Sequence, residues 1–171
     1  MQKIYAGIGS RQTPSHILRQ MEVIATILAL QGFVLRSGNC QGADQAFQRG
    51  ANAVNPKLVE LFLHWPGYEG ESIAKGNVVY TPCRKAYDIA AKYQRAWVIC
   101  SQGAKAMHAR NVQIILGVEL DQPVWQVICW TPRGKAVGGT AMGIFLALAY
   151  GIPVRNLAEE IRTCLQGEFC W

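Results

Sequence analysis

The first 65 residues alternate short apolar runs with longer stretches of helical periodicity, and this alternation limits the folds available to the chain. The helical stretches are 14–31 and 43–53, and the apolar runs are 3–8, 33–37 and 58–63. Helices that alternate with buried strands favour parallel pairing through right-handed crossovers. The pattern therefore predicts an α/β fold, a Rossmann-like three-layer sandwich with a mainly parallel sheet.

The rest of the chain continues the alternation less regularly. Helices are predicted at 84–94, 104–116, 141–150 and 158–165, and strands at 125–130 and from 152 to 154. We expect 65–82 to be a loop beyond the third strand, and 132–140 to be a glycine-containing turn. The short run 96–100 fits a strand and a buried helical segment equally well.

Local signals mark the ends of two of these helices. Thr13 or Ser15 is expected to cap the helix at 14–31, with Pro14 near its first turn and Gly32 at its end. Gly151 is expected to end the helix at 141–150.

The composition favours one compact domain that spans residues 1–171. Half of the residues are hydrophobic and only 16% are charged, which suits a sizeable core rather than a disordered chain. No apolar run reaches the ~20 residues that a membrane span needs. The N-terminus also lacks the apolar core of a signal peptide. We therefore expect a soluble, non-secreted protein of the cytoplasm with no membrane partner.

The cysteines occur without any CxxC pair, which favours free thiols over a disulfide scaffold or a zinc site. They are Cys40, Cys83, Cys100, Cys129, Cys164 and Cys170. Neither a metal nor a cofactor is expected.

The net charge of +6, from 17 basic against 11 acidic residues, favours anionic partners. No basic run is longer than the pair Arg84 and Lys85, so charge alone does not separate a nucleotide-binding protein from a nucleic-acid-binding one.

Two glycine-bearing loops follow the first and second predicted strands. The first contains Gly9, Ser10 and Arg11, whose small residues, hydroxyl and forked cation suit a phosphate. The second contains Ser37, Gly38, Gly42 and Asp44. Carboxyl ends of parallel strands meet at one edge of a sheet, so we expect both loops to border one ligand crevice. The alternative for each loop is an ordinary strand-to-helix turn, with Asp44 opposing the helix dipole.

Two further segments carry residues suited to anion binding. Arg110 and Asn111 lie in the helix at 104–116, where the alternative is a basic, exposed helix face. Gly138, Gly139 and Thr140 precede the helix at 141–150 and supply backbone amides and a hydroxyl, or else a tight turn with a threonine cap. Residues of all four segments are the predicted phosphate contacts.

These motifs resemble, in their order, the superfamily that unites the DNA-processing protein A (Smf) family with the LONELY GUY phosphoribohydrolases, above all its small phage-encoded branch. The resemblance covers residues 3–157 and is carried by 9–11, 35–38, 42–47, 110–111, 138–140 and 151–154. It implies a Rossmann-like fold whose loops hold nucleotide phosphates or single-stranded nucleic acid. Ser10, Arg11, Ser37, Gly38, Gly42 and Asp44 would then face the ligand. We also expect a homo-oligomer, in the host cytoplasm if the protein is phage-encoded.

The sequence departs from the phosphoribohydrolase pattern at two points. Asn111 replaces the lysine of the MxxRK segment, and 138–144 lacks the glutamate of the PGGxGTxxE segment. A glycosidase needs a carboxylate at the sugar, so this loss argues against enzymatic activity. Asp44 and Asp121 are the catalytic candidates that remain, with Glu119 beside them, and the spacing singles out none of the three.

The histidines His16, His64 and His108 show no metal-binding or triad spacing. By position, most of the aromatic side chains at 65, 68, 97, 125 and 130 are expected in the core. The alternative for Trp65 and Tyr68, in the irregular loop, is that they stack a base. Three hypotheses stay open. The chain binds and sequesters a nucleotide, a nucleotide-derived signal or single-stranded nucleic acid, or it is a nucleotide N-glycosidase, or it is a structural protein with a vestigial pocket.

Overall fold

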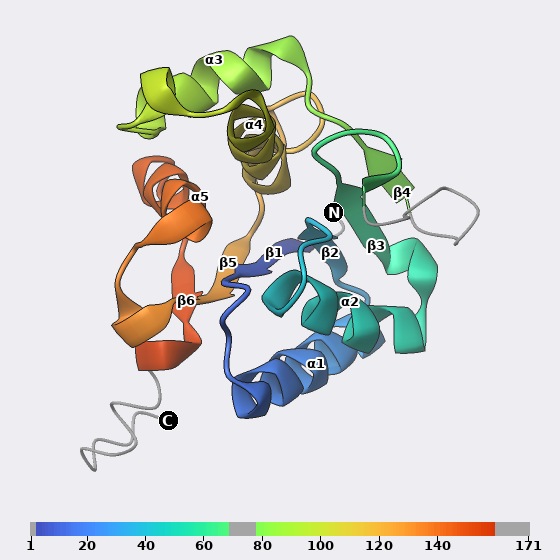
Figure 1. Ribbon diagram of the computed structural model, residues 1–171. Helices are drawn as coiled ribbons and strands as arrows, with labels where there is room; N and C mark the ends of the chain where they lie inside the picture. The colour runs from blue at the N-terminus through green and yellow to red at the C-terminus, as the bar shows by residue number, and fades with distance from the viewer. Residues whose placement is uncertain (1–2, 69–77, 160–171) are drawn as a thin grey trace.

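The computed structural model describes residues 3–68 and 78–159. Its centre is a six-stranded sheet in the order β4-β3-β2-β1-β5-β6, in which every neighbouring pair is parallel (Figure 1). The strands are β1 (Ile4–Gly9), β2 (Val34–Ser37), β3 (Val59–Phe62), β4 (Val78–Tyr80), β5 (Gln126–Trp130) and β6 (Val154–Asn156). The predicted parallel sheet is thus confirmed.

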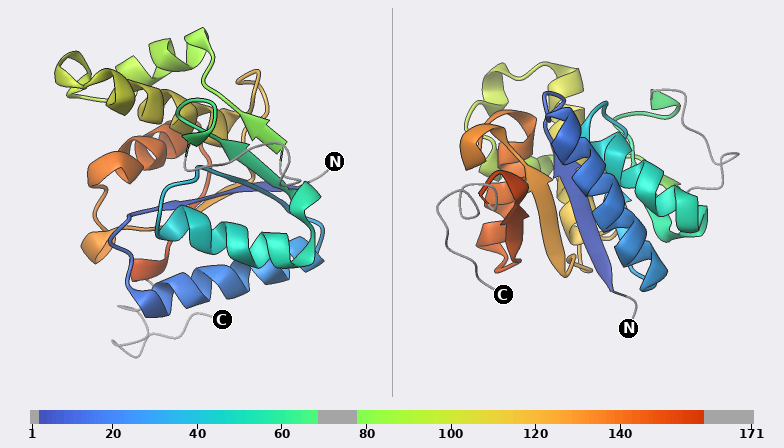
Figure 2. Two further views of the ribbon diagram at one scale, coloured as in Figure 1. Left: turned by 45° about the vertical axis from the view of Figure 1, so that its right-hand side comes forward. Right: turned by 90° about the horizontal axis from the view of Figure 1, so that it is seen from below.

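Helices cover both faces of the sheet, which makes three layers (Figure 2). One face carries α1 (Ser15–Leu30) and α2 (Ala43–Val54), and the other carries α3 (Arg84–Tyr93), α4 (Gln102–Leu116) and α5 (Gly138–Ala149). Short 3-10 turns occur at η1 (Pro56–Leu58), η4 (Trp97–Ile99) and η5 (Pro132–Gly134). Each face has its own apolar core, and the predicted Rossmann-like sandwich is confirmed.

The central strand β1 pairs with β2 on one side and with β5 on the other, and the two helical layers cover its faces. Tyr5 lies opposite Leu35 in one direction and Gln126 in the other. Helix α1 buries Ile17 and Met21, which lie one turn apart, in the same apolar core as Tyr5 of β1. The helix ends as predicted before Gly32, which adopts a left-handed conformation with a φ of 79°.

The strand order reverses at β1. From β1 the chain moves outward through β2, β3 and β4, and then returns to the other side of β1 as β5 and β6. The loops that follow β1 and β5 therefore leave toward opposite faces, with α1 below the sheet and α5 above it (Figure 1). Such a switch point opens a crevice at the carboxyl ends of the strands.

Three predicted elements differ from the structure. The expected loop at 65–82 contains β4, which extends the sheet by pairing with β3. The run 96–100 is neither a strand nor buried, because it forms the η4 turn with Val98 and Ile99 almost fully exposed. The turn at 132–140 already holds the first residues of α5, which begins at Gly138.

Several side-chain expectations also change. No side chain caps α1: Pro14 is its N-cap residue, and the Thr13 hydroxyl instead donates to the Ser10 carbonyl. Trp125 is half exposed rather than in the core. Most of the predicted helix at 158–165, together with Cys164 and Cys170, lies outside the described residues. Within the described part of the chain, no helix has the length and apolar character needed to cross a bilayer.

Candidate anion site at the strand switch point

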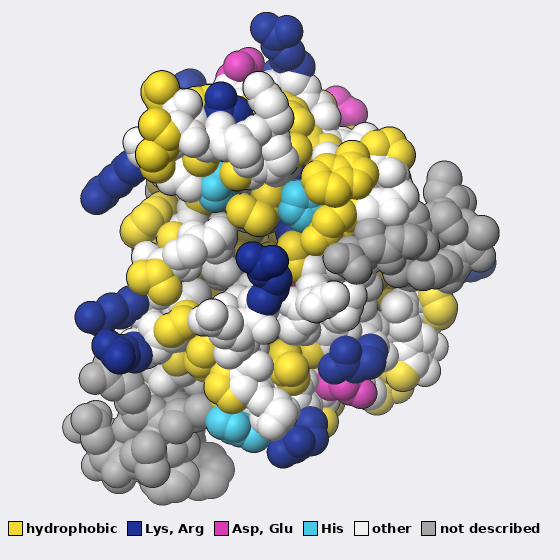
Figure 3. Space-filling model, in the orientation of Figure 1, with side chains coloured by type: hydrophobic (Ala, Val, Ile, Leu, Met, Phe, Trp, Pro, Cys, Tyr) yellow, Lys and Arg dark blue, Asp and Glu magenta, His cyan; other side chains and the backbone are white. Residues whose placement is uncertain are grey.

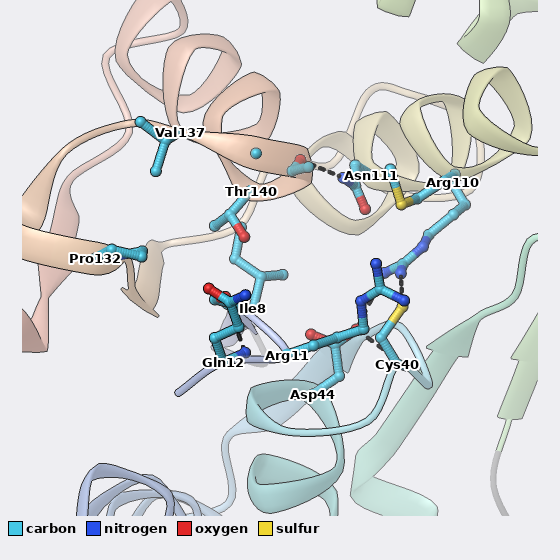
Figure 4. A pocket seen from close by; sticks show the side chains of 15 residues that line it. Ile8, Arg11, Gln12, Cys40, Asp44, Arg110, Asn111, Pro132, Val137 and Thr140 are labelled. Atoms are coloured by element: carbon cyan, nitrogen blue, oxygen red, sulfur yellow. Dashed lines mark hydrogen bonds and ion pairs between the residues drawn. The ribbon is translucent and has the colours of Figure 1, made fainter. Parts of the chain in front are cut away.

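A cavity of about 310 Å³ opens where the strand order reverses, at the carboxyl ends of β1 and β5. Figure 3 shows a hollow on this face, with a basic side chain at its rim and histidine and hydrophobic side chains above it. Four separate segments line it (Figure 4): Ile8, Gly9, Ser10, Arg11 and Gln12; Cys40 and Asp44; Met107, Arg110 and Asn111; and Pro132, Val137, Gly138, Gly139 and Thr140.

The loops after β1 and β2 form one wall because they pack backbone against backbone at Gly42. Gly42 has a φ of 88°, and a Cβ there would lie 3.0 Å from both the Arg11 Cα and the Ser10 carbonyl oxygen. A side chain at this position would be strained and would push the two loops apart. Gly42 therefore shapes the cavity from behind.

Ser10 holds the turn between β1 and α1 in place. Its amide donates to the Trp130 carbonyl at 3.3 Å, and its Oγ accepts from the Gln12 amide at 3.0 Å. The Thr13 hydroxyl donates to the Ser10 carbonyl at 2.6 Å. Because the Ser10 Oγ acts as an acceptor within the turn, its own proton can be donated to an anion in the cavity.

Arg110 enters the cavity from α4 and is only 3% exposed. Its Nη2 donates to the Cys40 Sγ at 2.9 Å, and its Nη1 lies 3.4 Å from the Asp44 Oδ2. The Arg110 Nε is buried and has no hydrogen-bond partner. A guanidinium carries five N–H donors, so this set of partners leaves a buried cation incompletely satisfied.

Gly38 makes room for this guanidinium. A Cβ at Gly38 would overlap both the Arg110 Nη1 and the Asp44 carboxylate. Gly38 thus lies directly against the Arg110–Asp44 ion pair, and it does not itself line the cavity.

Asp44 is the partner of Arg110, and burial raises the pKa of its carboxyl even though Arg110 and the Cys40 amide lower it. Burial likewise raises the pKa of the Cys40 thiol, against the opposing effect of Arg110. Both acidic groups next to the guanidinium are therefore biased toward their neutral forms.

A second cation reaches the same space. Figure 4 shows the side chains of Arg11 and Arg110 converging from the β1–α1 loop and from α4 near Cys40. Among the residues that line the cavity, Asp44 is the only carboxylate. Two guanidinium groups against one carboxyl group of raised pKa give the cavity an excess of positive charge.

The N-terminus of α5 forms the opposite wall. No side chain caps this helix and no acidic residue lies in its first turn, so the amides at Gly138, Gly139 and Thr140 are oriented for an anion. Asn111 ties the wall to α4 by donating its side-chain amide to the Gly139 carbonyl at 3.2 Å.

Nine of the twelve predicted contact residues line the cavity together. They are Gly9, Ser10, Arg11, Asp44, Arg110, Asn111, Gly138, Gly139 and Thr140. Ser37, Gly38 and Gly42 lie behind the wall, and the buried Ser37 hydroxyl donates to the Gly7 carbonyl at 2.6 Å. Asp121 and Glu119 are exposed in the loop before β5, at the opposite edge of the sheet, so of the candidate carboxylates only Asp44 reaches the cavity.

Cys40 and Gln12 also line the cavity, although neither was predicted to belong to the site. Both lie inside the two loops that the glycine spacing had marked, and this loop position was the available signal. The exposed-face alternative for Arg110 is wrong, since its side chain is buried in the cavity wall.

Two buried histidines feel the charge of Arg110. Burial, and then Arg110, lowers the pKa of His64 to about 4 and lowers that of His108. The Nδ1 atoms of both histidines are buried without a hydrogen-bond partner. In the described ranges, 3–68 and 78–159, no three His, Cys, Asp or Glu side chains cluster as metal ligands would.

Comparisons with known proteins show the fold and no family. No family model and no curated protein sequence matches the chain. The Moco carrier protein of Chlamydomonas rheinhardtii is a structural neighbour at 18% identity and a TM-score of 0.55, over 98% of this chain and 86% of that one. DNA processing protein A from Helicobacter pylori, described for its single-stranded DNA binding mode, aligns at 13% identity and a TM-score of 0.42, over 99% and 82%. A DNA processing protein A is thus among the structural neighbours, at a similarity too low to carry an argument.

Proposed function

We propose that the chain binds and sequesters a phosphate-bearing ligand in this cavity: a nucleotide, a nucleotide-derived signal or single-stranded nucleic acid. The observation that carries the proposal is the convergence of Arg11 and Arg110 beside a single carboxyl group of raised pKa. Phosphate oxygens would accept from both guanidinium forks, and charge-assisted bonds of this kind are the strong ones.

The amides of α5 support the same ligand. A helix N-terminus without a capping side chain favours negative charge, and here it faces the two arginines across the cavity. Ser10 and Thr140 add hydroxyl donors from opposite walls. A phosphate would thereby meet donors from three segments, the β1–α1 loop, α4 and the start of α5, which suits binding without any chemical step.

The direct test is ligand-induced stabilisation, measured as a shift in Tm with orthophosphate, AMP and a short single-stranded oligonucleotide. A ligand at 100 times its Kd should add about 2.7 kcal/mol to the free energy of unfolding. Arg11→Gln should weaken the affinity at least about tenfold, because it removes a charged hydrogen-bond donor. Arg49→Gln removes the same charge from an exposed ion pair on α2, outside the cavity lining, and should leave the affinity unchanged.

The salt dependence of binding separates the ligand classes. Affinity for a strand that contacts several phosphates should fall steeply with salt concentration, while affinity for one mononucleotide should fall little. If none of these compounds raises the Tm, the binding proposal fails and the structural alternative is favoured.

The alternative is a nucleotide N-glycosidase, and one observation supports it. Asp44 lies in the cavity wall with a raised pKa, as a carboxyl group that donates a proton would. Release of free base from nucleoside monophosphates that disappears in Asp44→Asn would establish this activity. The absence of base release from all common nucleotides would refute it.

A further inference from the structure

Three aromatic rings follow β3 and stand beside the cavity. We call His64, Trp65 and Tyr68 the aromatic shelf. Their ring centroids lie 4.2 Å apart for His64 and Tyr68, 5.3 Å for His64 and Trp65, and 5.1 Å for Trp65 and Tyr68. The Trp65 ring meets Tyr68 at 89°, an edge-to-face contact that holds an indole in a fixed orientation. Trp65 remains 49% exposed, although its two neighbours are largely covered.

The shelf is joined to the anion site through Cys40. The Cys40 Sγ lies 3.8 Å from the Tyr68 hydroxyl and accepts from the Arg110 Nη2 at 2.9 Å. The side-chain amide of Asn39 also donates to the Tyr68 carbonyl at 3.4 Å. One cysteine therefore touches both the guanidinium that would hold a phosphate and the edge of the shelf.

His64 is the buried member of the shelf. Only 8% of the residue is exposed, and its Nδ1 has no hydrogen-bond partner. With a pKa of about 4, the imidazole is neutral at pH 7. It therefore packs against Trp65 and Tyr68 as an uncharged ring.

From this juxtaposition we propose that the aromatic shelf binds the planar base of a nucleotide unit whose phosphate lies between Arg11 and Arg110. The exposed face of Trp65 stacks on the base, while Tyr68 and His64 hold the indole in place. This proposal rests on the proposed function and narrows it, because inorganic oxyanions and acidic peptides lack such a ring. A free nucleotide and a nucleotide within a single strand share the required chemistry.

The test measures the affinity of Trp65→Ala by calorimetry for AMP, ribose 5-phosphate and adenosine. Loss of stacking should weaken AMP binding about tenfold, equivalent to about 1.4 kcal/mol, and leave ribose 5-phosphate binding unchanged. Trp65→Phe, which keeps an aromatic face, should recover most of the affinity. Trp125→Ala is the matched control. Trp125 is 52% exposed, but it packs against Phe33 at the amino edge of the sheet, where the Trp125 backbone amide donates to the Ile4 carbonyl.

The outcomes separate the two proposals. If ribose 5-phosphate binds through Arg11 but Trp65→Ala binds AMP as tightly as the parent protein, the shelf proposal is overturned and the phosphate proposal stands. If adenosine binds through Trp65 while ribose 5-phosphate does not bind, the phosphate proposal is overturned and base binding at the shelf stands. An arm with a short oligodeoxyadenylate identifies the source of the base. Tighter binding of the strand than of AMP, again lost in Trp65→Ala, supports the shelf with a nucleic acid as ligand.

Discussion

Among the residues that the structure describes, two arginines are almost fully buried, and their side chains have very different hydrogen-bond partners. Arg36 in β2 is 2% exposed, and Arg110 in α4 is 3% exposed. The Arg36 Nε donates to the Glu60 carboxylate at 2.7 Å, and its Nη1 donates to the Gln122 carbonyl at 2.7 Å. Arg110 meets its carboxylate only at 3.4 Å, turns a second nitrogen to a thiol and leaves its Nε without a partner.

The difference separates a structural charge from one that is positioned for a ligand. Arg36 links β2, β3 and the loop before β5, and its side chain does not line the cavity at the switch point. Arg110 borders a cavity, and its weak partners leave hydrogen-bonding capacity directed at that space. A buried cation is costly unless it is paired, so the incomplete pairing of Arg110 at a cavity supports the proposed anion binding.

The largest expected effect is the loss of the well-paired arginine. Arg36→Met should lower the free energy of unfolding by about 3 kcal/mol, because it leaves Glu60 without its cation. We place the value at the low end for buried pairs because the Glu60 side chain keeps 21% exposure. Urea unfolding of Arg36→Met measures this loss of free energy. The variant should still show the ligand-induced shifts in Tm of the parent protein. An effect below 1 kcal/mol would contradict the structural role.

Arg110→Met should cost less stability, about 2 kcal/mol, and should abolish ligand-induced shifts in Tm. The smaller cost follows from Asp44, whose pKa is already raised by burial and which can take up a proton once Arg110 is gone. Urea unfolding at pH 7 and at pH 5 should show the cost shrinking at the lower pH. A cost equal to that of Arg36→Met at both values would remove the distinction between the two arginines.

A smaller effect concerns pH and the histidines beside Arg110. The pKa of His64 is about 4 when folded and about 6.5 when unfolded, so the unfolded chain binds more protons between these values. Stability should therefore fall as the pH drops from 7 to 5, by about 1 kcal/mol after allowance for residual solvation. His108 acts in the same direction and Asp44, with its raised pKa, in the opposite one.

The measurement compares urea unfolding of the parent protein and of His64→Gln at both pH values. The variant should show a flatter dependence on pH. An unchanged slope would mean that the His64 imidazole is not kept neutral next to Arg110.

The smallest effect is expected for an exposed arginine. Arg49 and Glu22 form an ion pair at 3.0 Å between α2 and α1, with both side chains largely in water. Arg49→Gln should change the free energy of unfolding by less than about 1 kcal/mol. A larger loss in urea unfolding would show that ion-pair distance, not burial, governs the ranking of these arginines.

Much of the fold followed from hydrophobic periodicity. The helices at 14–31 and 84–94 were predicted to within one residue at each end, because their apolar spacing and glycine or polar boundaries are local signals. Strand β4 was missed because three residues carry no periodicity, and only pairing with β3 makes them a strand. The exposed Val98 and Ile99 were misread for a similar reason, since a short apolar run does not reveal what covers it.

The site was predictable where it depends on topology. Ser10, Asp44 and Thr140 line one cavity because loops after parallel strands leave from one edge of a sheet. Ser37 was misplaced because it is still part of β2, where its hydroxyl bonds the neighbouring strand. The burial of Arg110 depends on the space that Gly38 leaves beneath it, a long-range contact that no local pattern encodes.

The four segments that enclose the cavity extend from Ile8 to Thr140. During synthesis a domain emerges from the ribosome amino end first. The nascent chain therefore has no complete cavity until two steps are finished. Strand β5 must have paired with β1, and the first turn of α5 must have been synthesised. A ligand that fits this cavity would recognise only a chain that has completed nearly all of its sheet, so occupancy would report on finished folding.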